Sequence, residues 1–465
     1  MSQSDLFSWN MERDPVLRST IVAVLILDTD PDWDRLVQTI DRGTRLVPRL
    51  RHRLITVPFG LAPPRWALDP GFDLSWHLRR VALPEPATMS AVLEFARTEA
   101  MTAFDPARPL WRSTLLSGLS DGGCALVMTV HHSLTDGIGG IQIATALLDF
   151  DRAGTDRGNS PELPHDSDGA LRDIVAWNWS VGSDLLRGGI SATPQTAWRA
   201  LTHPARALRD SAAFATSLVR LAKPVTATLS PVMIERSLGR RLAVLDAPVE
   251  QIRRAARAVG CTMNDAFLTA VVIGLRMYHE QHGATVDHLR LTMPISLRTA
   301  DDPLGGNRIT LARFALPVDI AETADLMRAV DVAVDRWRRE PAIPLSGAVA
   351  AAFNRLPVGV VTEMLKHVDF VASNVPGSPV PLYIAGARID AMYAFGPTIG
   401  TAVNVTMTSH TGTCYVAINA DTAAIPDLAT LTECLAAGFA TVLRLGGECA
   451  PQADATAEAS RSTPV

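Results

Sequence analysis

The sequence predicts a mixed α/β (α+β) fold made of two halves. In both halves, apolar runs with the character of β-strands alternate with segments of helical periodicity. Between the halves, residues 151–165 are rich in Asp, Gly, Ser and Pro, a composition typical of a linker. The 465 residues are 47% hydrophobic and 20% charged, as in an ordinary globular protein with a sizeable core. We therefore expect a pseudo-symmetric pair of mixed subdomains.

In the first half, strands and helices are expected to alternate. The expected strands cover residues 21–27, 65–66, 74–78, 111–116 and 125–130. The expected helices cover residues 32–47, 89–103 and 139–148. The first of these helices begins at an acidic cap, Asp32, which supports its assignment.

The second half starts near Leu242. Its expected helices are residues 248–258, with Pro248 suited to the first turn, and residues 263–279, a long apolar helix. The expected strands cover residues 289–293, 309–314, 368–372, 402–408 and 414–420. Residues 391–420 contain no Asp, Glu, Lys or Arg, but their Gly, Pro and Thr residues favour strands and turns over a membrane helix.

The region between the halves has the features of a surface that meets lipid. Residues 171–223 carry three of the nine tryptophans and seven basic against three acidic residues, in a chain of net charge −5. Basic amphipathic helices with tryptophan lie at membrane surfaces, although a crossover packed on the body of the protein is an equal alternative. The expected domains are 1–150, a linker with crossover helices at 151–240, 241–449, and a disordered tail at 450–465.

Bulk properties exclude several functions. The net charge of −5 gives no reason to expect nucleic acid as a partner. The five cysteines are scattered without a Cys-x-x-Cys pair, so neither a zinc site nor a disulfide framework is indicated, which suits a reducing cytoplasm. Residues 1–15 carry acidic residues and no apolar segment, so no secretory signal is expected.

The candidate chemistry lies in the segment His131-His132-Ser133-Leu134-Thr135-Asp136-Gly137, which follows an apolar strand. A neutral imidazole can take a proton from a hydroxyl near pH 7. Neighbouring residues of a strand point to opposite faces, so the two histidines do not easily enter one cavity. Two simpler interpretations remain, namely that the histidines only hold the strand end through hydrogen bonds, or that they bind a metal. The spacing fits no common zinc site.

The pattern His-His-x-x-x-Asp-Gly resembles the signature of CoA-dependent acyltransferases related to chloramphenicol acetyltransferase and of peptide-synthetase condensation domains. Further blocks narrow the resemblance to the bacterial wax ester synthase/acyl-CoA:diacylglycerol acyltransferase family, from about Asp5 to Leu445. These blocks are Asp5-Leu6-Phe7, Phe72 to Arg79, Pro109-Leu110-Trp111, Asn264-Asp265, Leu304-Gly305-Gly306-Asn307 and Ser373-Asn374-Val375-Pro376-Gly377.

The resemblance implies two chloramphenicol acetyltransferase-like subdomains that form a pseudo-dimer with an active-site tunnel between them. A long-chain acyl group would pass from acyl-CoA to diacylglycerol, or to a fatty alcohol, without an acyl-enzyme, a metal or a prosthetic group. His132 would be the base and His131 a supporting residue. Asp136 could contact the imidazole as in a Ser-His-Asp triad, but the resemblance favours an ion pair with Arg298 that joins the halves.

Four more residues are candidates for substrate binding. Gly137 would allow a tight turn at the site. Trp111 could contact substrate or fill the core. Asn264 could stabilise the oxyanion or position the acyl chain, or Asn264 or Asp265 could simply cap the following helix.

Other acceptors of the same fold, such as a polyketide or glycolipid alcohol, and a non-catalytic lipid-binding role remain alternatives. The expected location is the cytoplasm, in peripheral contact with the inner face of the plasma membrane or with lipid droplets.

Overall fold

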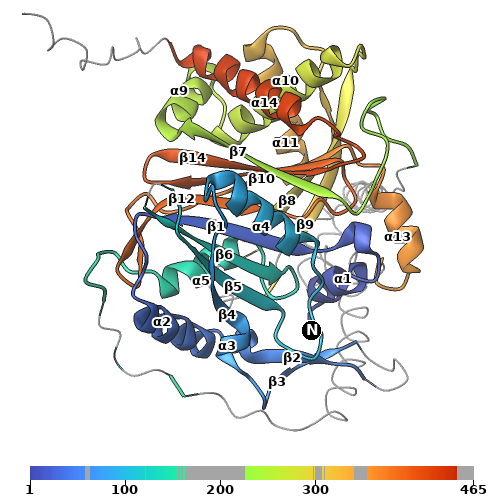
Figure 1. The fold of residues 1–465 in the computed structure, drawn as a ribbon. Coiled ribbons are helices and arrows are strands. Elements are labelled where there is room, and N and C mark those ends of the chain that lie inside the picture. Colours follow the sequence, from blue (N-terminus) through green and yellow to red (C-terminus); the bar gives the residue numbers. More distant parts are fainter. Residues whose placement is uncertain are drawn as a thin grey trace, which may run out of the picture.

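A computed structural model describes residues 1–57, 63–120, 122–155, 158, 161–162, 226–296, 298, 306–307, 309–339 and 353–447. The expected membrane-contact segment, 171–223, and the expected tail, 450–465, lie outside the described residues. The two halves of the chain form two layered bodies, which Figure 1 shows one above the other.

The first body is built on a six-stranded sheet with the order β11-β12-β1-β6-β5-β4. Its strands are β1 (Thr20–Leu27), β4 (Leu78–Ala82), β5 (Trp111–Ser117), β6 (Cys124–His131), β11 (Tyr383–Ile384) and β12 (Ala387–Phe395). Its helices are α2 (Trp33–Leu46), α3 (Leu74–His77), α4 (Met89–Met101) and α5 (Gly137–Leu147). A small hairpin of β2 (His52–Ile55) and β3 (Arg65–Leu68) lies at the lower edge in Figure 1.

The alternation of apolar residues along β1 explains how this sheet is covered on both faces. Leu25 and Leu27 belong to one core cluster, whereas Val22 and Val24 belong to another that also contains residues of α4 and of the second body. Successive side chains of a strand point to opposite faces, so a strand that is apolar at nearly every position is buried on both. The sheet therefore lies inside the molecule.

The second body is built on a six-stranded mixed sheet with the order β7-β14-β13-β10-β8-β9. Its strands are β7 (Arg240–Pro248), β8 (His288–Ser296), β9 (Ile309–Pro317), β10 (Phe370–Val375), β13 (Val403–His410) and β14 (Thr413–Asp421). Its helices α9 (Val249–Val259), α10 (Met263–Gln281), α11 (Thr323–Arg338) and α14 (Leu428–Leu443) contribute to a single core cluster with the sheet.

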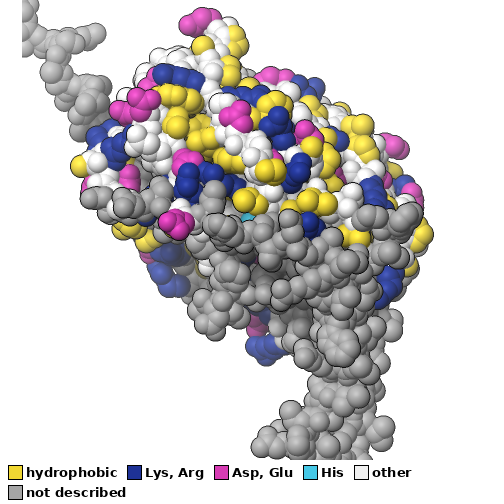
Figure 2. All heavy atoms as spheres, turned by 90° about the horizontal axis from the view of Figure 1, so that it is seen from below, with side chains coloured by type: hydrophobic (Ala, Val, Ile, Leu, Met, Phe, Trp, Pro, Cys, Tyr) yellow, Lys and Arg dark blue, Asp and Glu magenta, His cyan; other side chains and the backbone are white. Residues whose placement is uncertain are grey.

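The remaining helices and short turns complete the described fold. Helix α1 (Gln3–Met11) packs beside α13 (Val358–Leu365), as Figure 1 shows. Short 3-10 turns cover Pro15–Leu17, Pro48–Arg51 and Arg444–Gly446. On the described part of the face shown in Figure 2, basic and acidic side chains are interspersed with hydrophobic ones.

The second half of the chain contributes two strands, β11 and β12, to the first sheet. β12 pairs with β1 in antiparallel register, with Val22 opposite Phe395 and Leu25 opposite Met392. Residues 383–395 fall within the range expected for the second subdomain, yet they complete the first sheet. A hydrogen bond also joins the two sheets, since the Thr408 hydroxyl of β13 donates to the Met392 carbonyl of β12 at 2.7 Å.

One expected strand is wrong. Residues 74–77 form the helical turn α3, and the strand begins only at Leu78. The cause is Asp73, whose carboxylate accepts a hydrogen bond from the Ser75 backbone N–H at 2.9 Å and so caps a helical turn.

The charge-free segment 391–420 is confirmed as strand and turn structure, since it spans the end of β12, all of β13 and most of β14. By length and composition, one described helical segment, 428–446, could cross a membrane, or two if the bent pair α9 and α10 counts as one span. In the structure, Leu431 and Leu435 of this segment are completely buried in the core of the second body.

Candidate active site

His131 is held by protein groups on every side. It ends β6 and is fully buried, with its ring 5.7 Å from that of Trp9. Its Nδ1 accepts the Ser133 backbone N–H at 3.1 Å, which leaves Nε2 to donate to the Glu12 carboxylate at 3.3 Å. Burial acts to raise the pKa of Glu12, but the hydrogen bonds that it accepts from His131 and from the Ser19 backbone N–H, together with the nearby Arg18 guanidinium, lower that pKa overall. His131 thus links β6 to the end of α1.

His132 points the other way, into cavities. Its backbone N–H donates to the Ser19 carbonyl at 2.9 Å, and its side chain is only partly buried. Its Nδ1 lies 3.2 Å from the side-chain amide nitrogen of Asn307. Burial lowers the pKa of His132, although the nearby Asp136 carboxylate acts in the opposite direction. The ring is therefore neutral at pH 7 and can accept a proton.

Asp136 performs two structural tasks. Its Oδ1 accepts the Gly139 backbone N–H at 2.7 Å, which caps the N-terminus of α5. Its Oδ2 forms an ion pair with Arg298 Nη2 at 3.2 Å, and both side chains are almost completely buried. The structure thus brings together the two residues that the sequence pairs across the halves.

A short segment of the second half reaches the motif loop beside this ion pair. Gly306 forms a parallel bridge with Thr135, donates its N–H to the Leu134 carbonyl at 2.7 Å and accepts from Arg298 Nη2 at 2.7 Å. Its φ of +77° lies in the left-handed region that favours glycine. Asn307 directly follows Gly306, and its side chain contacts the His132 ring. The sequence contained the Gly-Asn block as a signal, but nothing in it indicated this contact.

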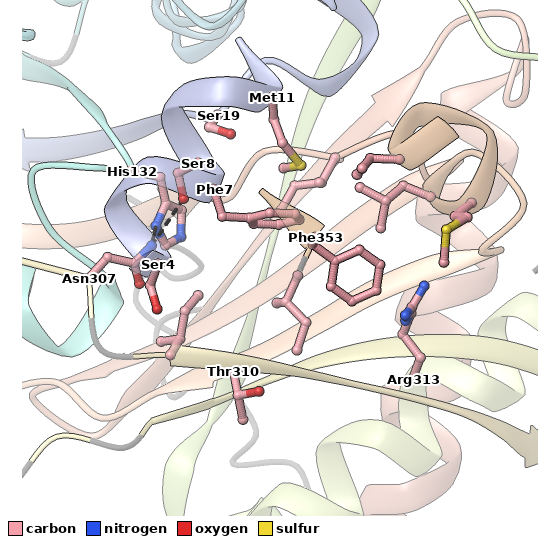
Figure 3. A pocket seen from close by; sticks show the side chains of 16 residues that line it. Ser4, Phe7, Ser8, Met11, Ser19, His132, Asn307, Thr310, Arg313 and Phe353 are labelled. Carbon is pink, nitrogen blue, oxygen red and sulfur yellow. Dashed lines mark hydrogen bonds between the residues drawn. The ribbon is translucent and has the colours of Figure 1, made fainter. Parts of the chain in front are cut away.

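Two cavities meet at His132, and a third adjoins one of them. A cavity of about 360 Å³ between the two bodies is lined by His132 and by polar residues that include Asn264, Ser296 and Asn374. A smaller, mostly apolar cavity of about 100 Å³ lies beside α1 and α13 and is also lined by His132 (Figure 3).

The third cavity is almost entirely apolar, has a volume of about 170 Å³ and lies beneath α5. It shares four lining residues with the cavity between the bodies, namely Ile21, Gly137, Val375 and Ala394. Gly137 stands at this junction, where a Cβ atom would come within 3.1 Å of Val375 Cγ2. The absence of a side chain at Gly137 therefore keeps the junction open.

The other expected substrate residues differ in their placement. The Asn264 side-chain nitrogen is buried without a hydrogen-bond partner in the described structure, and the residue lines the cavity between the bodies. Asp265 instead forms a capping box with Thr262 at the start of α10, and it does not line any of the three cavities. Trp111 lines the apolar cavity under α5, stacks on His77 and donates its indole N–H to the Leu50 carbonyl at 2.7 Å.

Comparison with solved structures supports the fold. The wax ester synthase/diacylglycerol acyltransferase from Marinobacter aquaeolei VT8 superposes with a TM-score of 0.62 at 23% identity, covering 95% of this chain and 98% of that one. The first condensation domain of the CDA synthetase superposes with a TM-score of 0.59 at 16% identity, covering 96% and 95%. At these identities the likeness shows the shared two-body fold.

Comparison with sequences identifies the family. A putative diacylglycerol O-acyltransferase of Mycobacterium tuberculosis (strain H37Rv) is 34% identical over 448 residues, which are 95% of this chain and 91% of the relative. A probable diacylglycerol O-acyltransferase of the same strain is 27% identical, covering 87% and 86%. The model of the wax ester synthase/diacylglycerol acyltransferase catalytic domain matches residues 1–267, and that of the C-terminal domain matches residues 305–442. This chain therefore belongs to the wax ester synthase/diacylglycerol acyltransferase family of acyltransferases.

Proposed function

We propose that this protein transfers a long-chain acyl group from acyl-CoA to the free hydroxyl of diacylglycerol, giving triacylglycerol and CoA. The observation that carries the proposal is the position of His132, which lines both the cavity between the bodies, with its amide and hydroxyl groups, and the mostly apolar cavity beside α1 and α13. A base at such a junction can act on a hydroxyl whose hydrocarbon chains are sequestered from water. The names of the relatives support diacylglycerol as the acceptor.

In the proposed reaction, Nε2 of His132 takes the hydroxyl proton as the acceptor oxygen forms a bond to the thioester carbonyl carbon. The resulting tetrahedral intermediate then expels the CoA thiolate, and the imidazolium returns its proton to the sulfur. The low pKa that burial gives His132 suits this cycle, because the ring begins neutral and the imidazolium is a strong enough acid to protonate the leaving group. The scheme uses no metal, prosthetic group or acyl-enzyme.

The cavities suggest where the parts of the two substrates lie. The cavity between the bodies contains amide and hydroxyl side chains such as Asn264, Ser296 and Asn404, which can hydrogen-bond the amides of the pantetheine arm of CoA. The two apolar cavities fit hydrocarbon chains, one from the donor and one from the acceptor. The unpartnered amide nitrogen of Asn264 is a donor for the thioester oxygen as it gains charge.

The acceptor also suggests a location. Diacylglycerol resides in lipid, so we propose peripheral contact with the inner face of the plasma membrane or with lipid droplets. Co-sedimentation of the full chain with liposomes containing diacylglycerol tests this, and recovery of the protein only in the supernatant would contradict it.

The decisive experiment for the reaction combines palmitoyl-CoA with a panel of acceptors and measures both free thiol and lipid product. The panel is diacylglycerol, hexadecanol and a glycolipid alcohol. We expect CoA release that depends on acceptor, with triacylglycerol as the main product. Asn419→Ser, at a buried asparagine that none of the three cavities includes, is the control for His132→Ala.

We expect His132→Ala to lower the rate by about 100-fold or more, the usual contribution of a general base, while Asn419→Ser retains it. Acceptor-dependent CoA release by His132→Ala at the wild-type rate would show that another group is the base. No CoA release by the wild type with any acceptor would contradict the enzymatic function.

A further inference from the structure

The side-chain amide of Asn307 contacts the ring of the proposed base. Its side-chain amide lies 3.2 Å from His132 Nδ1 and 3.1 Å from Ser8 Oγ, as Figure 3 shows. The residue is 4% exposed, and its backbone N–H donates to the buried Asp5 carboxylate at 3.1 Å. Asn307 is thus fixed by α1 on one side and touches the catalytic ring on the other.

The orientation of this amide is coupled to the position of the proton on the His132 ring. A neutral imidazole has one N–H and one lone pair. If the amide NH₂ donated to Nδ1, the ring proton would sit on Nε2, which then could not accept the proton of the substrate hydroxyl. If the amide oxygen faces Nδ1, the proton stays on Nδ1 and Nε2 is free to act as the base.

The two orientations have the same shape, because turning the amide by 180° exchanges groups of nearly equal size. In either orientation one end of the amide contacts His132 and Ser8, and the other end lies where the Asn307 oxygen has no hydrogen-bond partner within the described structure, so these contacts alone do not select an orientation. The His132 ring also forms a hydrogen bond with its own backbone carbonyl, which only a protonated Nδ1 can donate. With the amide turned so that its oxygen faces His132, this oxygen accepts from both His132 Nδ1–H and the Ser8 hydroxyl. Only this orientation is compatible with a proton on Nδ1, and the NH₂ group then takes the buried place of the oxygen on the other side of the amide.

We propose that Asn307 is a positioning residue that holds His132 in the tautomer with its proton on Nδ1, through a hydrogen bond accepted by the Asn307 side-chain oxygen. This inference rests on the proposed function, since it concerns the base of that reaction. Asn307 itself does not exchange a proton with substrate.

The segment that carries Asn307 is coupled to the ion pair between the two bodies. Arg298 Nη2 contacts both the Asp136 carboxylate and the Gly306 carbonyl, so the ion pair holds the residue immediately before Asn307. The bridge between Gly306 and Thr135 holds the same point from the motif loop. The tautomer of His132 therefore depends on correct contact between the first and second halves.

The first test uses the wild-type chain with ¹⁵N-labelled histidine. At pH 8, long-range ¹H–¹⁵N spectra distinguish a protonated ring nitrogen from one with a lone pair, and the His132 signals are identified by their loss in His132→Ala. We expect the His132 signal pattern of the Nδ1–H tautomer. A pattern with the proton on Nε2 would overturn the proposal without any further variant.

The second test measures the dependence of kcat and KM on pH for Asn307→Leu and Asn307→Asp. Leucine fills similar space but accepts no hydrogen bond, so we expect kcat to fall at least about tenfold while KM changes less than about threefold, because loss of the correct tautomer removes the base and not the binding site. Aspartate retains the acceptor and should restore most of kcat.

Aspartate should also shift the acidic limb of the pH profile upward, because a carboxylate beside the ring favours the imidazolium. The other titratable groups near His132 are Asp136, His131 and Asp5, and they are the same in both variants. The matched control is Asn419→Asp, which places a carboxylate at a site that is 3% exposed and has no hydrogen bond to His132 among those described.

The outcomes separate this inference from the function on which it rests. Wild-type kcat in Asn307→Leu, with His132→Ala inactive, would overturn the role of Asn307 and leave the base in place. Activity in His132→Ala would overturn both. A profile of Asn307→Asp that matches the wild type would also contradict the proposal, and thermal unfolding of each variant confirms that the compared proteins are folded.

Discussion

The buried ion pair between Asp136 and Arg298 should contribute far more to stability as a pair than either residue does alone. Asp136→Asn can still cap α5 through its amide oxygen, so its main effect is to remove the negative charge beside a buried guanidinium. Breaking such a pair from one side costs about 3 kcal/mol. Arg298→Met should cost about the same, because it leaves the Asp136 carboxylate buried without its counter-charge. Asp136→Ala should cost about 4 kcal/mol, since it also removes the cap, which is typically worth about 1 kcal/mol.

The double variant Asp136→Asn/Arg298→Met removes both charges and should cost no more than about 3 kcal/mol, well below the sum of about 6 kcal/mol for the two single changes. Urea unfolding followed by circular dichroism gives these free energies. The control is the exposed pair Asp325–Arg328, whose side chains are 62% and 57% exposed and for which we expect a coupling below about 1 kcal/mol. Additive costs at Asp136 and Arg298 would refute the view that the two charges compensate each other in the interior.

Three further predictions concern the histidines and the apolar cavity. His131→Ala should lower the free energy of unfolding by about 3 kcal/mol, because it leaves a cavity and deprives Glu12 of a buried donor. His132→Ala should change the free energy of unfolding by less than about 1 kcal/mol. Equal losses of the two variants in urea unfolding would contradict the assigned roles. Because burial lowers the pKa of His132, kcat/KM should stay level from pH 8 to below pH 6.5 and fall only as the pH drops through that lowered pKa. A decline that is already complete at pH 6.5 would argue against His132 as the titrating base. Ala144→Leu adds three carbons to the 170 Å³ cavity under α5. It should lower the ratio of kcat/KM for palmitoyl-CoA to kcat/KM for octanoyl-CoA by about tenfold or more, at about 0.8 kcal/mol for each CH₂ that is displaced. The control is Ala437→Leu at an exposed position, and an unchanged ratio in Ala144→Leu would place the acyl chain elsewhere.

The order of elements follows closely from local sequence. Asp32 caps α2, Pro248 precedes α9, and the apolar runs before His131 and after Met263 become β6 and α10. These signals are local, since a cap or a turn residue acts within four positions of itself. Residues 74–77 were misjudged because the β-like run of apolar and aromatic residues outweighed the cap at Asp73.

The site is only partly predictable because its contacts connect distant segments. Asp136 and Arg298 could be paired in advance, because the family resemblance favours an ion pair between the aspartate of the motif and an arginine of the second half. The contact between Asn307 and His132 spans 175 positions and depends on a glycine with positive φ, which no sequence pattern reveals. Asn264 and Asp265 look equivalent in sequence, yet one lines the cavity and the other caps a helix, because successive helical residues point about 100° apart.

The pairing of β1 with β12 has a consequence for how the chain is made. β1 ends at Leu27 and its partner β12 spans Ala387–Phe395, so about 360 further residues are synthesised before β1 can pair with β12. At the usual 5–20 residues per second, the ribosome needs roughly 20–70 s to supply them. During that time β1 presents unpaired backbone groups and an apolar face, the kind of edge that recruits other strands. We therefore expect the first half, when made without the second, to be less stable than the whole chain and more prone to associate through this edge.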